Sequence, residues 1–146
     1  MWEPARAYLS GVRFLVYGVL GCFCELAWSG LWAAVRYRDP SLKGRVSVWM
    51  FPIYGLGLGA GFDLLAAIGG TWAWPLRGVL YALAVWLVEL AVGLPTRNRL
   101  WDYSGTRWSW RGVLRWDYGP VWAAFGLLLE PVRRFVDGAL AASGVG

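Results

Sequence analysis

Four long apolar runs constrain this chain more than any other feature of its sequence. They cover residues 14–35, 46–69, 78–95 and 118–136 of the 146. A helix needs about 20 predominantly apolar residues to cross the hydrocarbon of a bilayer. The composition agrees, because 58% of the residues are hydrophobic and only 16% are charged, which lies outside the usual range of soluble domains. We therefore predict an all-α membrane protein, a compact bundle of about four transmembrane helices that forms a single integral membrane domain over residues 1–146.

The connections between the runs are short, and they carry most of the positive charge. Short connections make neighbouring helices antiparallel, as in an up-and-down bundle. Most of the 14 lysines and arginines lie beside the first and third connections. The positive-inside rule then places these two connections in the cytoplasm and both termini outside, and we expect a protein of the bacterial cytoplasmic membrane. Basic residues beside spans suit the phosphates of membrane lipids, so nucleic acid is not the expected partner.

Several other classes of segment and site are disfavoured. Arg6 and Arg13 precede the first run as in a secretory signal, but the run is longer than a signal core and carries Glu25 in its middle. Cys22 and Cys24 fall on different faces of one helix, which predicts neither a disulfide nor a zinc site. Histidine is absent, which removes the commonest metal ligand and general base. We expect no metal and no cofactor, so any chemistry must use carboxylates, tyrosines and arginines.

Two glutamates inside apolar runs are the first candidates for a functional site, because an ionisable group in hydrocarbon is costly. Spacings of three and four place each of them on a helix face with aromatic residues and glycine. These faces are Tyr17, Gly21, Glu25, Trp28 and Trp32 in the first run, and Trp86, Glu89 and Gly93 in the third. In the second run, Gly57 and Gly61 form a small-xxx-small pair that predicts the close approach of another helix.

The segment "RLWDYSG", Arg99 to Gly105, follows the third run directly. We expect it to be the lid and anchor of a polar centre, into which the four helices bring their polar residues on one half of the bundle. A short acid followed by a phenol near arginines can form a charge-balanced network. The candidate substrate-binding residues are Glu25, Tyr54, Glu89, Arg97, Arg99, Trp101, Asp102, Tyr103, Ser104, Asp117 and Tyr118.

An ordered set of short motifs runs from about residue 18 to residue 135. These are "GCFCE", "SLKGRVSVWMFPIYGLG", "ELAVG", "WDYS" and "DYGPVW". Together they resemble the family of ABC-transporter type IV membrane proteins, which is similar to the transmembrane protein 229 family of animals. The resemblance implies a small multi-span membrane protein in which Glu25, Tyr54 with Gly55, Glu89, and Trp101 to Ser104 recur. After "WDYS" the sequence places Arg111 and Asp117, closer to the animal branch. The chain has no P-loop, so an ATPase would have to be a separate partner.

Three functions stay open on these residues. A permease-like transport or lipid-handling module would bind an anionic small molecule or lipid headgroup at the arginines and exchange protons or cations at the carboxylates. A membrane-embedded lipid-modifying enzyme would use Glu25 and Glu89 as acid and base, but Ser104 has no histidine to activate it. A structural or assembly subunit would use the carboxylates to fix an arrangement with a second copy or a separate membrane subunit.

Overall fold

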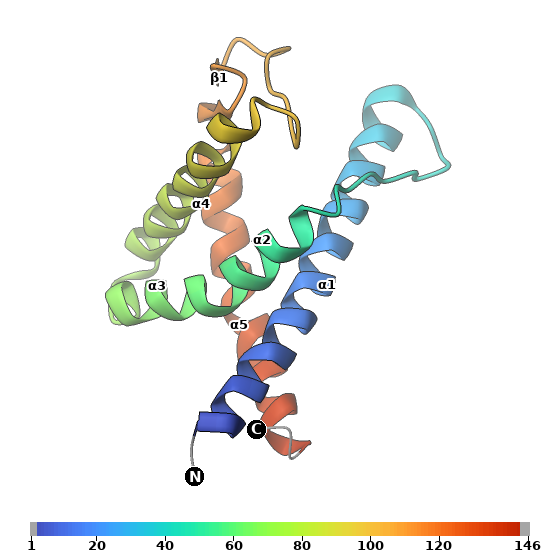
Figure 1. Cartoon of the computed structure of the whole chain (residues 1–146). Coiled ribbons are helices and arrows are strands. Elements are labelled where there is room, and N and C mark those ends of the chain that lie inside the picture. The colour runs from blue at the N-terminus through green and yellow to red at the C-terminus, as the bar shows by residue number, and fades with distance from the viewer. Residues whose placement is uncertain (1–2, 144–146) are drawn as a thin grey trace. The chain divides into compact units, whose positions relative to one another are not determined.

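The computed structural model describes residues 3–143, with side chains from residue 11 onward, and these are mostly helical. The helical elements are α1 (Glu3–Tyr37), α2 (Met50–Leu56), the π-helix η1 (Gly57–Gly61), α3 (Phe62–Gly69), α4 (Trp74–Thr96), the 3-10 helix η2 (Trp116–Tyr118) and α5 (Gly119–Ala142) (Figure 1). The strands are β1 (Ser109–Trp110) and β2 (Leu114–Arg115). The all-α class is thereby confirmed. Contacts divide the chain into two compact units, which we call unit 1, up to Leu64, and unit 2, Leu65–Ala142.

Three helical segments are long and apolar enough to cross a membrane: Gly11–Tyr37, Met50–Gly69 and Trp74–Thr96. They correspond to the first three predicted runs, and on this basis the chain is an integral membrane protein. The second helix begins at Met50 rather than at residue 46, because the preceding residues run along α1 without helical structure. α5 covers the fourth run but carries four charged residues, Glu130, Arg133, Arg134 and Asp137, and is not among the three. A fourth crossing stays a prediction, as does the single domain.

Close packing of α1 on α2 holds unit 1 together. Gly21 lies under the ring of Tyr54, and Gly55 lies under the ring of Phe14, so that a Cβ atom at either glycine would overlap the ring. Tyr17 is fully buried. Glycine at such positions lets two helices approach closely, which favours dispersion contacts inside a membrane.

The predicted glycine pair takes no part in this packing. No heavy atom lies within 4 Å of the position that a Cβ of Gly57 would occupy, and a Cβ at Gly61 would meet only the backbone of Leu56 in its own segment. The prediction that this pair brings two helices together is therefore wrong for α1 and α2. Both residues lie in the π-helix η1, whose wider turn shifts the faces that a regular helix would present.

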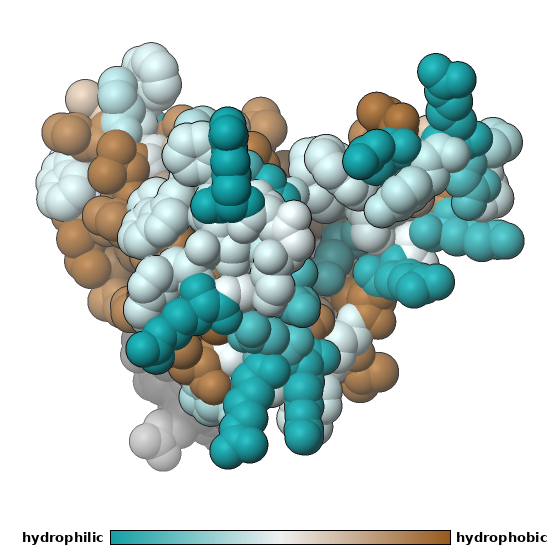
Figure 2. Space-filling model, turned by 90° about the horizontal axis from the view of Figure 1, so that it is seen from above, coloured by the Kyte–Doolittle hydropathy of each residue, from teal (hydrophilic) through white to brown (hydrophobic). Residues whose placement is uncertain are grey.

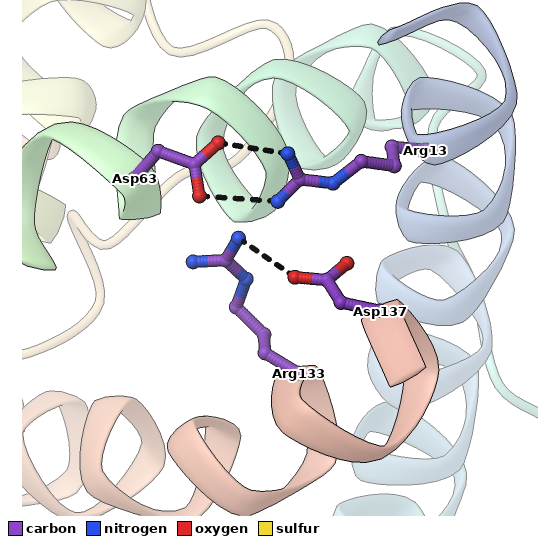
Figure 3. Close-up of polar contacts among 4 residues, drawn as sticks. All are labelled: Arg13, Asp63, Arg133 and Asp137. Atoms are coloured by element: carbon purple, nitrogen blue, oxygen red, sulfur yellow. Dashed lines mark hydrogen bonds and ion pairs between the residues drawn. The ribbon is translucent and has the colours of Figure 1, made fainter. Parts of the chain in front are cut away.

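Each unit contains ion pairs, and Figure 3 shows one from each. In unit 1 the guanidinium of Arg13 donates two hydrogen bonds to Asp63, at 2.9 and 3.0 Å, and so joins α1 to α3. In unit 2, Arg133 and Asp137 form a pair one turn apart on α5, at 3.4 Å. The pair of Arg13 with Asp63 is bidentate, and bidentate arginine–carboxylate pairs fix the geometry of a contact as well as contributing energy.

In unit 2, α4 packs on α5 in the same close manner. Gly126 lies under Tyr81, and a Cβ at this glycine would overlap the tyrosine side chain. The hydroxyl of Tyr81 donates to Glu130 at 2.8 Å. Arg77 donates to the same carboxylate through Nε at 2.8 Å and through a terminal nitrogen at 3.1 Å. This network fixes the first turns of α4 against α5.

Candidate functional site

In unit 1 the predicted site residues Glu25 and Tyr54 contact each other directly. The phenol of Tyr54 donates a hydrogen bond of 2.8 Å to Glu25 Oε2, across the packing of α1 and α2. Gly21, one turn before Glu25, leaves room for the tyrosine ring. Trp28 and Trp32 stack on each other with centroids 6.5 Å apart. Each of the two is 49% exposed, so this end of the predicted face lies outside the packing.

In unit 2 the segment between α4 and α5, residues 97–118, folds back over the end of α4, and we call it the connection. Arg97 and Asn98 adopt left-handed backbone conformations, with φ of 51° and 59°, which end α4 and reverse the chain. The side-chain amide of Asn98 donates to the carbonyl of Arg111 at 2.9 Å. The backbone N–H of Tyr103 donates to the carbonyl of Gly112 at 2.8 Å. The two halves of the connection are thus held together by hydrogen bonds within the connection itself.

A small hairpin, β1 with β2, forms the second half of the connection. Arg111 and Gly112 turn the chain with φ of 54° and 72°, and the N–H of Val113 donates to the carbonyl of Trp110 at 3.0 Å. Two successive left-handed residues are typical of the turn that matches the twist of a two-stranded hairpin. The hairpin places Val113 and Leu114 inside unit 2, each only 2% exposed.

Two tryptophans fasten the hairpin to α4. The indole of Trp101 donates to the carbonyl of Val113 at 2.9 Å, and the indole of Trp86 donates to the carbonyl of Arg115 at 3.1 Å. Gly93 on α4 lies directly under Val113, where a Cβ would overlap the valine side chain. Trp86 and Gly93 therefore act on the same face of α4, as their spacing predicts.

Glu89 lies on this face, between the two anchors. Its carboxyl is buried, with the residue only 5% exposed. The phenol of Tyr103 donates to Glu89 Oε1 at 3.0 Å. The other oxygen, Oε2, is buried and accepts no hydrogen bond from any residue that the structure describes. The segment "RLWDYSG" contacts the Glu89 carboxyl through Tyr103, and its role as a lid stays a prediction.

Burial of Tyr103 raises the pKa of its phenol well above the ordinary value, and the neighbouring Glu89 carboxyl adds to the shift. A buried phenol resists ionisation because the phenolate would lose its hydration. Tyr103 therefore remains a hydrogen-bond donor to Glu89 throughout the neutral pH range. The lid contact is a neutral phenol donating to a buried carboxyl.

Arg115 and Tyr118 complete the surroundings of Tyr103. The guanidinium of Arg115 lies 3.8 Å from the ring centroid of Tyr118 and donates to the Asp117 carboxylate through Nε at 3.0 Å. This pair lowers the pKa of Asp117 below its ordinary value. The ring of Tyr118 meets the rings of Tyr103 and Trp122 edge to face, at 6.0 and 5.5 Å. The predicted residues Asp117 and Tyr118 therefore support the lid residue Tyr103.

The remaining predicted residues of the connection lie at the surface. Asp102 accepts hydrogen bonds from both the backbone and the hydroxyl of Ser104, and these bonds lower the pKa of Asp102. This is a local turn motif, in which a short side chain satisfies the backbone two residues later. The side chains of Arg97 and Arg99 are exposed and form no ion pair with any described residue.

The structure thus resolves the predicted site into two carboxyl–tyrosine pairs, Glu25 with Tyr54 in unit 1 and Glu89 with Tyr103 in unit 2. A shared centre of both carboxylates stays a prediction. Sequence reasoning missed Arg115 and Trp122, although the position of Arg115 two residues before Asp117 was a usable signal. Within the described residues no group of three metal-ligating side chains is present, and both cysteines are free.

Comparison with known proteins assigns neither a family nor a fold relative. The chain matches no protein-family model and no solved structure. The resemblance to ABC-transporter type IV membrane proteins therefore stays a prediction.

Proposed function

We propose that this chain is a permease-like transport or lipid-handling module of a membrane, in which Glu89 is the central functional residue. The observation that carries this proposal is the state of the Glu89 carboxyl. It is buried on an apolar helix, one oxygen accepts from Tyr103, and the other has no partner among the described residues. A carboxyl with a spare buried oxygen can take up a proton, a cation or a hydrogen bond from a substrate.

The cost of this arrangement supports a functional reading. A buried polar atom without a partner costs about 1–3 kcal/mol, and nearly all buried polar groups in folded proteins are paired. A carboxyl that served only to fix helix packing would gain from a second donor. Glu25 with Tyr54 has the simpler geometry of a packing contact between two helices, and we assign it that role.

The lid gives the module a way to open. The phenol of Tyr103 donates a hydrogen bond to Glu89, and Tyr103 belongs to a segment outside the three candidate spans. Movement of the connection would expose the carboxyl without separating α4 from α5. Motions of loops on this scale are common in gated sites.

The enzyme alternative receives less support from the geometry. The hydroxyl of Ser104 donates to Asp102 at the surface, so it is neither buried near Glu89 nor beside a base of suitable strength. A nucleophile needs an adjacent base that a third group orients. The described residues offer no such set around Ser104.

Native mass spectrometry of the protein released from its own membrane tests the proposal. We expect the wild type to carry a defined small molecule or lipid and Glu89→Gln to lose it. Asp39→Asn is the control, because Asp39 bonds only its local turn at Ser41 in unit 1. Circular dichroism checks that both variants stay helical. A wild type that carries only a second protein subunit, or a Glu89→Gln variant that keeps the bound species, would overturn the proposal.

A further inference from the structure

The outer face of the connection carries a cluster of basic and aromatic side chains, which we call the arginine surface. It consists of Arg97, Arg99, Arg107, Arg111, Trp108 and Trp110, all of them exposed. From this surface we infer that the connection binds the phosphate of anionic lipid headgroups. The inference rests on the proposed function in that it names a ligand class for it, but it uses different residues from the Glu89 site.

The charge of the arginine surface is not neutralised within the protein. The connection contains five arginines and two aspartates. Asp117 is paired with Arg115, and Asp102 accepts from Ser104. The four arginines of the surface form no ion pair with any described residue. Four guanidinium groups are therefore available to an external anion.

Two of these guanidinium groups are held on tryptophan rings. The Arg107 guanidinium lies 5.1 Å from the ring centroid of Trp108, and that of Arg111 lies 5.0 Å from the centroid of Trp110. Stacking on an aromatic face leaves the edge of the guanidinium, with its N–H groups, open for bidentate contact with phosphate. It also reduces the side-chain freedom that binding would otherwise remove.

The position of the arginine surface favours a lipid over a soluble anion. The connection starts directly after Thr96, the last residue of a candidate membrane span. The headgroups of a bilayer lie at the ends of the spans, and tryptophan is enriched at this level. Trp108 and Trp110 are 49% and 41% exposed. Figure 2, a view from above, shows hydrophilic side chains projecting at the end of the molecule where Figure 1 draws the connection.

The arrangement thus combines the features that recognise an anionic membrane surface. Guanidinium groups provide charge and paired donors, exposed indoles provide contacts at the headgroup level, and the adjacent span fixes the depth. Basic residues beside a span attract anionic lipids with an energy that adds over the residues. Phosphate is the shared chemistry of lipid headgroups and soluble phosphate esters, so the test must separate the two.

The test titrates the purified full chain in detergent with short-chain phosphatidylglycerol or phosphatidylcholine and counts bound lipids by native mass spectrometry. We expect preferential binding of phosphatidylglycerol. The double variant Arg107→Gln with Arg111→Gln should bind it roughly 30-fold more weakly, from the contribution of each basic residue at an anionic surface. The control, Arg36→Gln with Arg38→Gln, removes the same charge from the end of α1 in unit 1 and should change the affinity far less.

Three outcomes would overturn the inference. These are equal binding of the two lipids, an equal loss in the control variant, and displacement of the lipid by soluble glycerol phosphate at matched concentration. Glu89→Gln is titrated in parallel and should keep its preference for phosphatidylglycerol. If Glu89→Gln loses the co-purified species but the wild type shows no lipid preference, only this inference is refuted. If the wild type prefers phosphatidylglycerol but Glu89→Gln keeps the co-purified species, only the proposed function is refuted.

Discussion

Removal of the Tyr103 hydroxyl is the sharpest test of the lid. The phenol donates at 3.0 Å to a carboxyl that accepts no other hydrogen bond from a described side chain. Tyr103→Phe keeps the ring, which packs edge to face on Tyr118, and removes only the donor. The Glu89 carboxyl would then be buried without its side-chain donor.

Two ranges of hydrogen-bond energy set the expected loss of stability in Tyr103→Phe. Hydrogen bonds to charged groups contribute about 1.5–3 kcal/mol in soluble proteins, whereas side-chain hydrogen bonds inside membrane proteins average about 0.6 kcal/mol. Glu89 is on an apolar helix, whereas Tyr103 comes from the connection outside that helix. Water can therefore replace the Tyr103 hydroxyl at the Glu89 carboxyl only after the connection moves. We therefore expect Tyr103→Phe to reduce the free energy of unfolding by about 1–2 kcal/mol, between these limits.

A double-mutant cycle isolates this contact. Tyr103→Phe and Glu89→Gln are made singly and together, and the free energy of unfolding is measured in mixed micelles by tryptophan fluorescence. We expect a coupling energy of about 1 kcal/mol. Tyr118→Phe is the matched control, because the Tyr118 hydroxyl forms no hydrogen bond with described residues. Coupling below about 0.3 kcal/mol, the scatter of independent sites, or an equal effect of the control would refute the role of Tyr103.

Three further results are expected. Arg115 lowers the pKa of Asp117 in the folded state. The stability that this pair contributes is therefore present above the unfolded pKa of about 3.9 and is lost as the pH falls through the folded pKa. Acid melts of the wild type and Asp117→Asn should converge at low pH, and parallel curves would contradict this. Burial raises the pKa of Tyr103, so the stability contributed by the neutral phenol is complete below about pH 10 and is lost at higher pH. In an ultraviolet titration of the phenols, the last ionisation step should be missing from Tyr103→Phe. A last step that remains in this variant would argue against the burial of Tyr103. Gly126→Ala should lower the free energy of unfolding by about 1–3 kcal/mol through overpacking. Gly138→Ala on the same helix, where no atom lies within 4 Å of a Cβ, should be neutral or stabilising by up to about 1 kcal/mol. Thermal melts that rank the two variants the other way would refute the packing of α4 on α5.

Helical periodicity was sufficient to place the Glu89 face. Trp86, Glu89 and Gly93 recur at spacings of three and four, so any α-helix brings them to one side, and the structure packs all three against the connection. The same reasoning was less successful for Gly57 and Gly61, because the π-helix that contains them departs from the period on which the prediction depends.

The sequence by itself determined the helical class, three of the four predicted spans and the two glutamates inside apolar runs, because length, hydropathy and period are local properties of the chain. The tertiary structure alone decided the partners. Tyr103 reaches Glu89 because Arg97 and Asn98 reverse the chain and a hairpin turns at Arg111 and Gly112. Left-handed arginines such as Arg97 and Arg111 carry no strong sequence signal. Pairs such as Arg77 with Glu130 join residues far apart in the chain, so only the packing of one helix on another selects them among the available charges.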